Sequence, residues 1–188
     1  MKLTNDMIRW IDDHAKDDTS RLRFRYNDDP AARFCILQIE CRRQAAKKLP
    51  QTLKCSRFQF PTSLSAEQCT SDDIAAFHAS LVSSGETVLD MTAGLGIDAF
   101  HMARRGAQVT AIDINPDVAE ALTHNAEALK LPLHALCGDS VSYIQETTQQ
   151  FDTIFIDPAR HGKGGQRLLA LSDGMPDVVS LHPLLRKT

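Results

Sequence analysis

The most constraining feature of the sequence is a short apolar strand that runs into a glycine-rich turn and the start of a helix, over residues 88–98. Glycines let the backbone approach a ligand closely and adopt φ values that other residues avoid. The free N–H groups at the start of the helix would then face that ligand. The turn therefore predicts a nucleotide-like ligand at the carboxyl end of a buried strand.

Two classes of ligand fit this turn, and Asp90 distinguishes them. Residues 94–99 match the dinucleotide pattern G-x-G-x-x-G/A, in which the turn holds a pyrophosphate. A carboxylate at the end of the same strand would repel that pyrophosphate in a partly desolvated cleft. S-adenosylmethionine carries no phosphate but has an ammonium and a sulfonium, so Asp90 favours it over a nicotinamide dinucleotide.

Further acidic residues follow the next predicted strands along the chain. Asp113 suits the two ribose hydroxyls, a role for which nicotinamide enzymes also use an acid. Asp139 suits an adenine amino group, and Asp157 follows the next strand. Ligands bind outside the carboxyl ends of parallel strands, so these residues are expected to share one site. The predicted cofactor-binding residues are Asp90, Thr92, Gly94, Gly96, Asp113, Ile114, Asp139 and Ser140.

Strand and helix patterns alternate after residue 85, which indicates a parallel sheet covered by helices. The predicted strands lie at 87–91, 107–113, 133–137, 151–157 and 178–181. The predicted helices lie at 97–105, 116–129, 140–148 and 164–172. The expected fold class is therefore an α/β, Rossmann-like domain over residues 85–188.

Residues 1–84 are predicted to form a small all-helical region. The clearest helices lie at 4–15, 30–49 and 70–82, and a loop with a short extended piece is expected at 50–63. Two basic segments of this region could contact phosphates: residues 21–26 and the helix at 33–48. The alternative is a half-buried strand or loop and a solvated helix face, which the formal net charge of −3 favours.

Methyltransferases of this architecture, the class that an S-adenosylmethionine site would indicate, usually continue with two more strands after the fifth. Only residues 182–188 follow the predicted fifth strand, so the last strands are expected to be missing. The fifth strand would then be an unpaired apolar edge, and such edges favour self-association. No apolar run has membrane length and no hydrophobic leader follows Met1, so a cytoplasmic protein is expected. The seven His residues show no metal-binding spacing, and no metal site is predicted.

Five segments resemble a bacterial family of class I S-adenosylmethionine-dependent methyltransferases that carry a THUMP-like domain at the C-terminus. The segments are residues 48–50, 64–71, 90–98, 157–160 and 176–178. The resemblance implies an all-helical N-terminal region, a Rossmann-like methyltransferase domain and RNA as the substrate. It also implies that the THUMP-like domain is absent from this chain.

The Asp-Pro-Ala-Arg motif at 157–160 bears on the methyl acceptor. Enzymes that methylate an amino group of a base often have D/N-P-P-aromatic here, so Asp157 and backbone carbonyls could hold an amine. The guanidinium of Arg160 could stack on the base. The predicted catalytic residues are Asp157, Pro158 and Arg160. The family often has a second basic residue next, where this chain has His161.

Uridine C5-methyltransferases can share this motif, but they need a cysteine shortly after the fifth strand. That place reads Ser-Leu-His-Pro at 180–183, which disfavours the covalent mechanism. The turn at 92–96 is shared with guanine-N2 methyltransferases of small-subunit ribosomal RNA and favours an exocyclic amine. Two alternatives stay open: an NAD-type oxidoreductase, and a non-catalytic RNA-binding module with a vestigial cofactor site.

Overall fold

A parallel four-stranded sheet in the order β3-β2-β1-β4 lies at the centre of the computed structural model, which describes residues 1–158 and 176–185. Leu89 pairs with Thr110 on one side and with Ile154 on the other. Because every pairing is parallel, the carboxyl ends of all four strands meet at one edge. The strands are β1 Thr87–Asp90, β2 Gln108–Asp113, β3 Leu133–Cys137 and β4 Thr153–Phe155.

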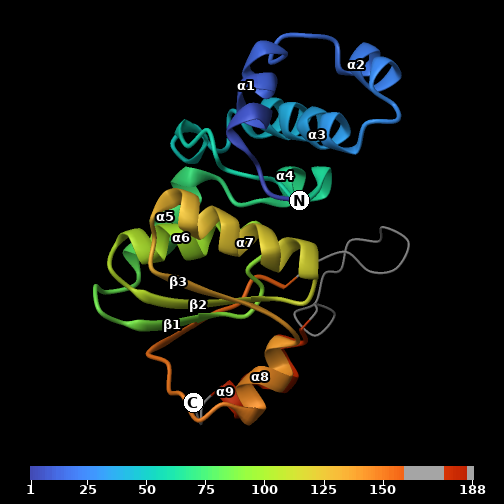
Figure 1. Ribbon diagram of the computed structural model, residues 1–188. Coiled ribbons are helices and arrows are strands. Elements are labelled where there is room, and N and C mark those ends of the chain that lie inside the picture. Colours follow the sequence, from blue (N-terminus) through green and yellow to red (C-terminus); the bar gives the residue numbers. More distant parts are fainter. Residues whose placement is uncertain (159–175, 186–188) are drawn as a thin grey trace.

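Helices cover both faces of the sheet (Figure 1). Successive strand residues point to opposite faces: Val88 and Val109 pack into one buried cluster, whereas Leu89 and Ile112 pack into another. The helices on the first face are α6 Ile97–Arg104 and α7 Pro116–Leu129. Those on the second are α8 Ser140–Glu146 and α9 Val178–Leu185. The predicted Rossmann-like α/β fold is confirmed.

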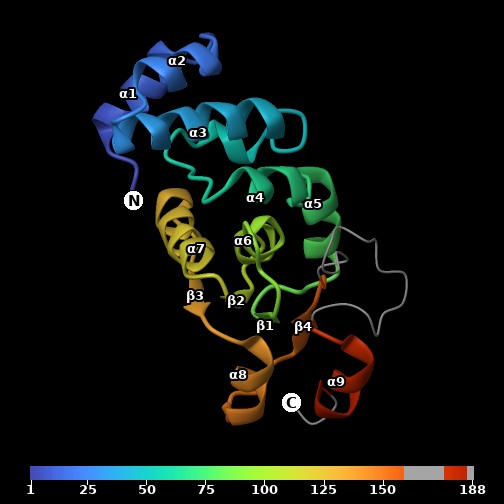
Figure 2. The same ribbon diagram turned by 90° about the vertical axis from the view of Figure 1, so that its right-hand side faces the viewer.

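The N-terminal helices pack outside α6 and α7, as Figure 2 shows. Many of these helices begin after an aspartate or a hydroxyl residue whose side chain accepts hydrogen bonds from the free N–H groups of the first turn. Asp29, in front of α3, is an example. The helices are α1 Asn5–Asp13, α2 Thr19–Arg25, α3 Pro30–Ala45, the 3-10 helix η1 Thr52–Lys54, α4 Ser63–Gln68 and α5 Asp72–Ser80.

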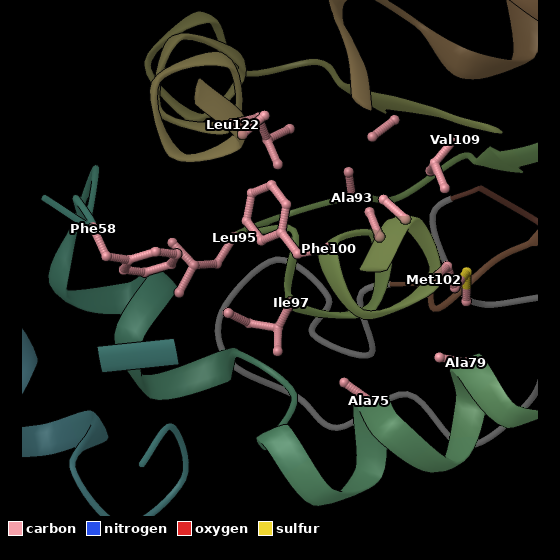
Figure 3. Close-up of a cluster of buried hydrophobic side chains, with 14 of the residues drawn as sticks. Phe58, Ala75, Ala79, Ala93, Leu95, Ile97, Phe100, Met102, Val109 and Leu122 are labelled. Atoms are coloured by element: carbon pink, nitrogen blue, oxygen red, sulfur yellow. The ribbon is translucent and has the colours of Figure 1, made fainter. Parts of the chain in front are cut away.

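One buried cluster joins this helical region to the sheet. Phe58 packs edge-on against Phe100 of α6, with ring centroids 6.3 Å apart, and Leu122 of α7 lies beside them (Figure 3). The cluster runs from Cys41 to Ala126 in sequence, so it crosses residue 85 without a break. The division of the chain at that residue stays a prediction. No helix in residues 1–158 or 176–185 has both the length and the apolarity needed to cross a bilayer.

The predicted fifth strand at 178–181 is wrong, because these residues form α9. Asp177 accepts hydrogen bonds from the N–H groups of Val179 (2.9 Å) and Ser180 (3.2 Å), which caps the helix. Leu181 then packs with Ile144 against the sheet. The apolar edge expected there, and the argument against a cysteine nucleophile at 180–183, both lose their basis.

Two short helices of the N-terminal region differ from the sequence prediction. Residues 21–26 belong largely to α2, which begins where Asp18 accepts from the N–H of Ser20 at 2.9 Å. Helix α4 has no counterpart among the predicted elements, because its six residues are too short for a period to show. The helix predicted at 164–172 lies outside the described residues.

Candidate functional site

A cavity of about 980 Å³ opens at the carboxyl edge of the sheet. Its walls are the turn after β1, the ends of the other three strands and a segment of the helical region around α4. It contains every predicted cofactor-binding residue: Asp90, Thr92, Gly94, Gly96, Asp113, Ile114, Asp139 and Ser140. Asp157 and Pro158 line it too, whereas Arg160 and His161 lie outside the described residues.

The two glycines of the turn serve different purposes. Gly94 (φ +51°) and Gly96 (φ +84°) both adopt the left-handed conformation that glycine favours. A Cβ on Gly96 would lie 2.3 Å from a methyl carbon of Leu122 and 3.0 Å from the ring of Phe100, so a larger residue there would force these buried side chains to shift. A Cβ on Gly94 would come no closer than 3.9 Å to any protein atom, the Thr92 carbonyl oxygen. Gly94 therefore leaves room on the cavity side for a ligand.

Asp113 ties the end of β2 to the glycine turn. Its carboxylate accepts from the N–H of Gly94 (3.0 Å) and from the N–H of Asn115 (2.8 Å). A carboxylate has about four acceptor sites, so Asp113 retains capacity for ligand hydroxyls. Asp139 caps α8 by accepting from the N–H of Val141 at 2.8 Å, and it is otherwise exposed to the cavity.

Asp90 is the buried member of the site, with 1% of its surface exposed. Burial raises the pKa of its carboxyl from 3.8 to about 7. The N–H of Thr92, which donates to Asp90 at 3.1 Å, lowers that pKa, while the charges of Asp98, Asp113 and Asp157 raise it further. The ionised form of Asp90 thus lacks a cationic partner among the described residues, and a cationic ligand would supply one.

Asp157 lies at the open side of the cavity with an exposed side chain. Its backbone N–H donates to the hydroxyl of Thr92 at 2.8 Å, so the turn after β1 fixes the start of the Asp-Pro motif. The carboxylate itself has no such anchor among the described residues, which suits contact with an incoming molecule.

The charge of the cavity is one-sided. Five aspartates line it, and no lysine, arginine or histidine does so among the residues that the structure describes. The field in such a low-dielectric cleft attracts cations and repels phosphates. The same described ranges contain no cluster of His, Cys, Asp and Glu suited to a metal ion. The five aspartates are Asp90, Asp98, Asp113, Asp139 and Asp157.

The helical region supplies a wall of the cavity that the sequence did not predict. Helix α4 and its flanks contribute uncharged polar side chains, namely Thr62, Ser65, Gln68, Cys69 and Thr70. Lys48 positions this wall, because its ammonium donates to the carbonyls of Glu67 and Cys69 at the end of α4. The only sequence signal was that residues 64–71 carry the family resemblance.

The basic helix at 33–48 is largely committed to internal contacts. Arg42 donates to the carbonyls of Ser56 (2.6 Å) and Phe58 (2.7 Å), and Arg43 donates to those of Ala15 and Asp17. Together with Lys48, three of the five basic side chains of residues 33–48 thus donate hydrogen bonds to backbone carbonyls. This arrangement leaves little of the predicted phosphate-contacting face.

Comparison with known proteins agrees with this geometry. Residues 88–171 match the family described as "Methyltransferase domain". The fold is that of a class I methyltransferase. The crystal structure of a "putative methyltransferase" from Porphyromonas gingivalis W83 superposes with a TM-score of 0.81 and 29% identity, over 98% of this chain and 47% of that one.

Curated relatives match over shorter stretches of the chain. The ribosomal RNA small subunit methyltransferase J of Coxiella burnetii is 40% identical over 81 residues, which are 38% of this chain and 31% of that protein. The tRNA (guanine(37)-N(1))-methyltransferase of Anopheles gambiae is 36% identical over 72 residues, or 37% and 13%. The chain therefore spans about a third or less of these curated relatives and about half of the similar crystal structure. S-adenosylmethionine is the cofactor that a methyltransferase domain of this kind implies.

Proposed function

We propose that this chain binds S-adenosylmethionine and transfers its methyl group to a base of RNA. The observation that carries the proposal is the cavity at the carboxyl edge of the sheet, with five aspartates and no basic side chain among its described residues. The cofactor brings two cations and no phosphate, so it matches that charge. A dinucleotide would place two phosphates there at a Coulombic cost.

The individual aspartates fit different parts of the cofactor. Asp113, which stands at the end of β2 beside the glycine turn, would accept both ribose hydroxyls. Asp139 would accept from the adenine amino group, with Ser140 beside it. Ile114 is 74% exposed although it is apolar, and it lines the cavity, so it offers a surface on which the adenine ring can pack. Asp90 would face the cationic end, and its ionised form is stabilised there.

Asp157 would act on the methyl acceptor. Catalysis of this transfer is mostly a matter of positioning the acceptor in line with the methyl group. The exposed carboxylate of Asp157 and the carbonyl of Pro158 can accept hydrogen bonds from an amino group, and Asp157 can take the proton that the amine loses. An exocyclic amine is therefore the acceptor that this edge suits, with Arg160 as a further candidate for stacking.

RNA as the substrate is supported by the relatives, two of which are named for ribosomal RNA and transfer RNA methylation. The family resemblance adds a C-terminal THUMP-like domain as the part that would grip RNA. A cytoplasmic location is part of the same proposal. The self-association predicted from a fifth-strand edge has lost that basis.

Two measurements test the proposal. Titration of the chain with S-adenosylmethionine and with NAD by calorimetry separates the methyltransferase from the oxidoreductase, and NAD binding without S-adenosylmethionine binding would refute it. Transfer of labelled methyl groups to bulk RNA, by a version that includes any further domain, separates an enzyme from a non-catalytic RNA-binding module. The expected result is cofactor binding by residues 1–188 and label in RNA.

A further inference from the structure

Two histidine–aspartate pairs join α5 to α6. In one pair the histidine belongs to α5 and the aspartate to α6, and in the other pair these positions are exchanged. His78 of α5 lies with its Nδ1 2.8 Å from an oxygen of Asp98 on α6. His101 of α6 lies with its Nε2 3.1 Å from an oxygen of Asp72 on α5. A carboxylate only accepts hydrogen bonds, so the histidine is the donor in both pairs. The two pairs share their chemistry and their interface but differ in surroundings.

The pair of His101 and Asp72 is structural. Its side chains are only 12% and 3% exposed, and Asp72 does not line the cavity. Asp72 also accepts from the N–H groups of Gln51 (2.7 Å) and Thr52 (3.1 Å) and from the Thr52 hydroxyl. Its acceptor sites are therefore filled by the protein, and the pair ties the helical region to α6.

The pair of His78 and Asp98 faces the cavity. Asp98 stands in the first turn of α6, two residues after Gly96, and it lines the cavity with 11% of its side chain exposed. His78 donates to Oδ1 of Asp98, and no described residue donates a hydrogen bond to Oδ2 of Asp98. The ring of His78 packs against Phe155, at 5.4 Å between centroids, which is the end of the strand that leads to Asp157. Asp98 thus presents a held carboxylate with a free acceptor atom to the cavity.

We propose that Asp98 binds the α-ammonium of the cofactor and that His78 is the positioning residue that aims it. The proposal rests on the proposed function and adds the contact for the cofactor's amino acid. Asp113 and Asp139 are assigned to the nucleoside and Asp157 to the acceptor, while Asp90 lines the cavity with only 1% of its surface exposed, so it would act on the cationic end through its charge rather than through a direct hydrogen bond. Asp98 is the remaining carboxylate of the five. Through His78, a helix of the N-terminal region would contribute to cofactor binding.

Three probes separate this role from a general effect on the cavity. S-adenosylmethionine and S-adenosylhomocysteine carry the ammonium, whereas 5′-methylthioadenosine has the same nucleoside and lacks the amino acid. Asp98→Asn should weaken binding of the first two by roughly tenfold to a hundredfold, the loss of one charge-assisted hydrogen bond. The affinity of Asp98→Asn for 5′-methylthioadenosine should change by less than about twofold. Calorimetry measures all three affinities.

The histidine is tested by a matched set of variants. His78→Ala should weaken S-adenosylhomocysteine binding about threefold to tenfold and leave 5′-methylthioadenosine unaffected. His78→Asn, whose amide nitrogen can replace Nδ1 as a donor, should restore most of that loss. His101→Ala is the control, because it removes the reciprocal pair from the same interface. It should lower the melting temperature without changing the preference between the probes.

The possible outcomes separate the assignment of Asp98, the positioning role of His78 and the proposed function. Equal loss of all three probes in Asp98→Asn, or unchanged S-adenosylhomocysteine binding in a folded variant, would overturn the assignment of Asp98 while leaving the proposed function intact. A His101→Ala variant that reproduces the probe preference of His78→Ala would overturn the positioning role. An unaltered chain that binds none of the three probes would refute the proposed function itself.

Discussion

Replacing Asp90 with asparagine should stabilise the empty protein at alkaline pH and weaken its hold on the cofactor. The pKa of the Asp90 carboxyl is raised from 3.8 to about 7 by burial and by neighbouring aspartates, so the folded chain holds a proton there that the unfolded chain releases. The stability that this carboxyl contributes is therefore fully present below pH 3.8 and is lost as the pH rises through 7. The full rise corresponds to about 4 kcal/mol.

The size of the expected effect follows from the pH interval. Between pH 5 and pH 8 the unaltered chain should lose about 2–3 kcal/mol of stability at this one site. An asparagine side chain has the shape of the protonated acid and can still accept from the N–H of Thr92, so Asp90→Asn should escape this loss. For a chain of this size the melting temperatures should diverge by roughly 5–10 °C between pH 5 and pH 8. Thermal unfolding at several pH values measures the divergence.

Cofactor binding should respond in the opposite direction. A cation beside Asp90 favours its ionised form, so binding near pH 6 must release a proton, and affinity should fall by about tenfold for each pH unit below 7. Asp90→Asn should abolish this dependence and bind about tenfold more weakly at pH 8. Asp139→Asn is the control for the loss of a carboxylate from the site: it should weaken binding but leave the pH dependence of binding in place. Parallel melting curves for Asp90→Asn and the unaltered chain from pH 5 to pH 8 would refute the reasoning.

Three further predictions concern the remaining walls of the site. Asp113→Ala should weaken S-adenosylmethionine binding by roughly tenfold to a hundredfold, because it removes a charge-assisted acceptor of about 1.5–3 kcal/mol; unchanged affinity by calorimetry would take Asp113 out of the site. Asp157→Ala should abolish methyl transfer while cofactor affinity changes by less than about threefold, or ~0.7 kcal/mol, since the backbone bond to Thr92 persists; a large loss of affinity would contradict this. Gly94→Ala should lower the free energy of unfolding by about 1–2 kcal/mol and should also impair cofactor binding. Gly96→Ala should lower the free energy of unfolding by about 2–5 kcal/mol, because its Cβ would meet Leu122. Equal melting temperatures of the two variants would contradict that contrast.

The sheet and its acidic edge could be predicted because their signals are local. Each of the first four strands is a short apolar run that ends at an acid or a turn, and the residue after it necessarily lies at the carboxyl edge of a parallel sheet. Helix α7 was predicted at its observed bounds because Pro116 marks its start and Pro132 follows its end; in the structure Lys130 ends the helix in the left-handed conformation. Such start and stop residues act locally and do not depend on tertiary contacts.

The errors occurred where distant contacts decide the structure. Val178 and Val179 favour a strand by themselves, but Asp177 caps a helix whose leucines pack against α8 and the sheet. The wall formed by α4 depends on Lys48, which lies about twenty residues earlier and holds the α4 carbonyls. Likewise, the pairing of His78 with Asp98 joins residues from two helices, and neither residue has a sequence pattern of its own.

Under the proposed function, the charge of the cavity also limits how RNA could reach it. A nucleobase is uncharged and can enter a site rimmed by aspartates, where an amino group would gain hydrogen bonds to carboxylates. The phosphates on either side of that base would be repelled by the same carboxylates. The proposed RNA substrate would therefore have to be presented with its base turned inward and its backbone kept outside, as in enzymes that act on single-stranded or flipped bases. Since Arg42, Arg43 and Lys48 donate to backbone carbonyls of the protein, the cations that would hold the backbone of the proposed RNA substrate would have to come from other surfaces than this face of α3.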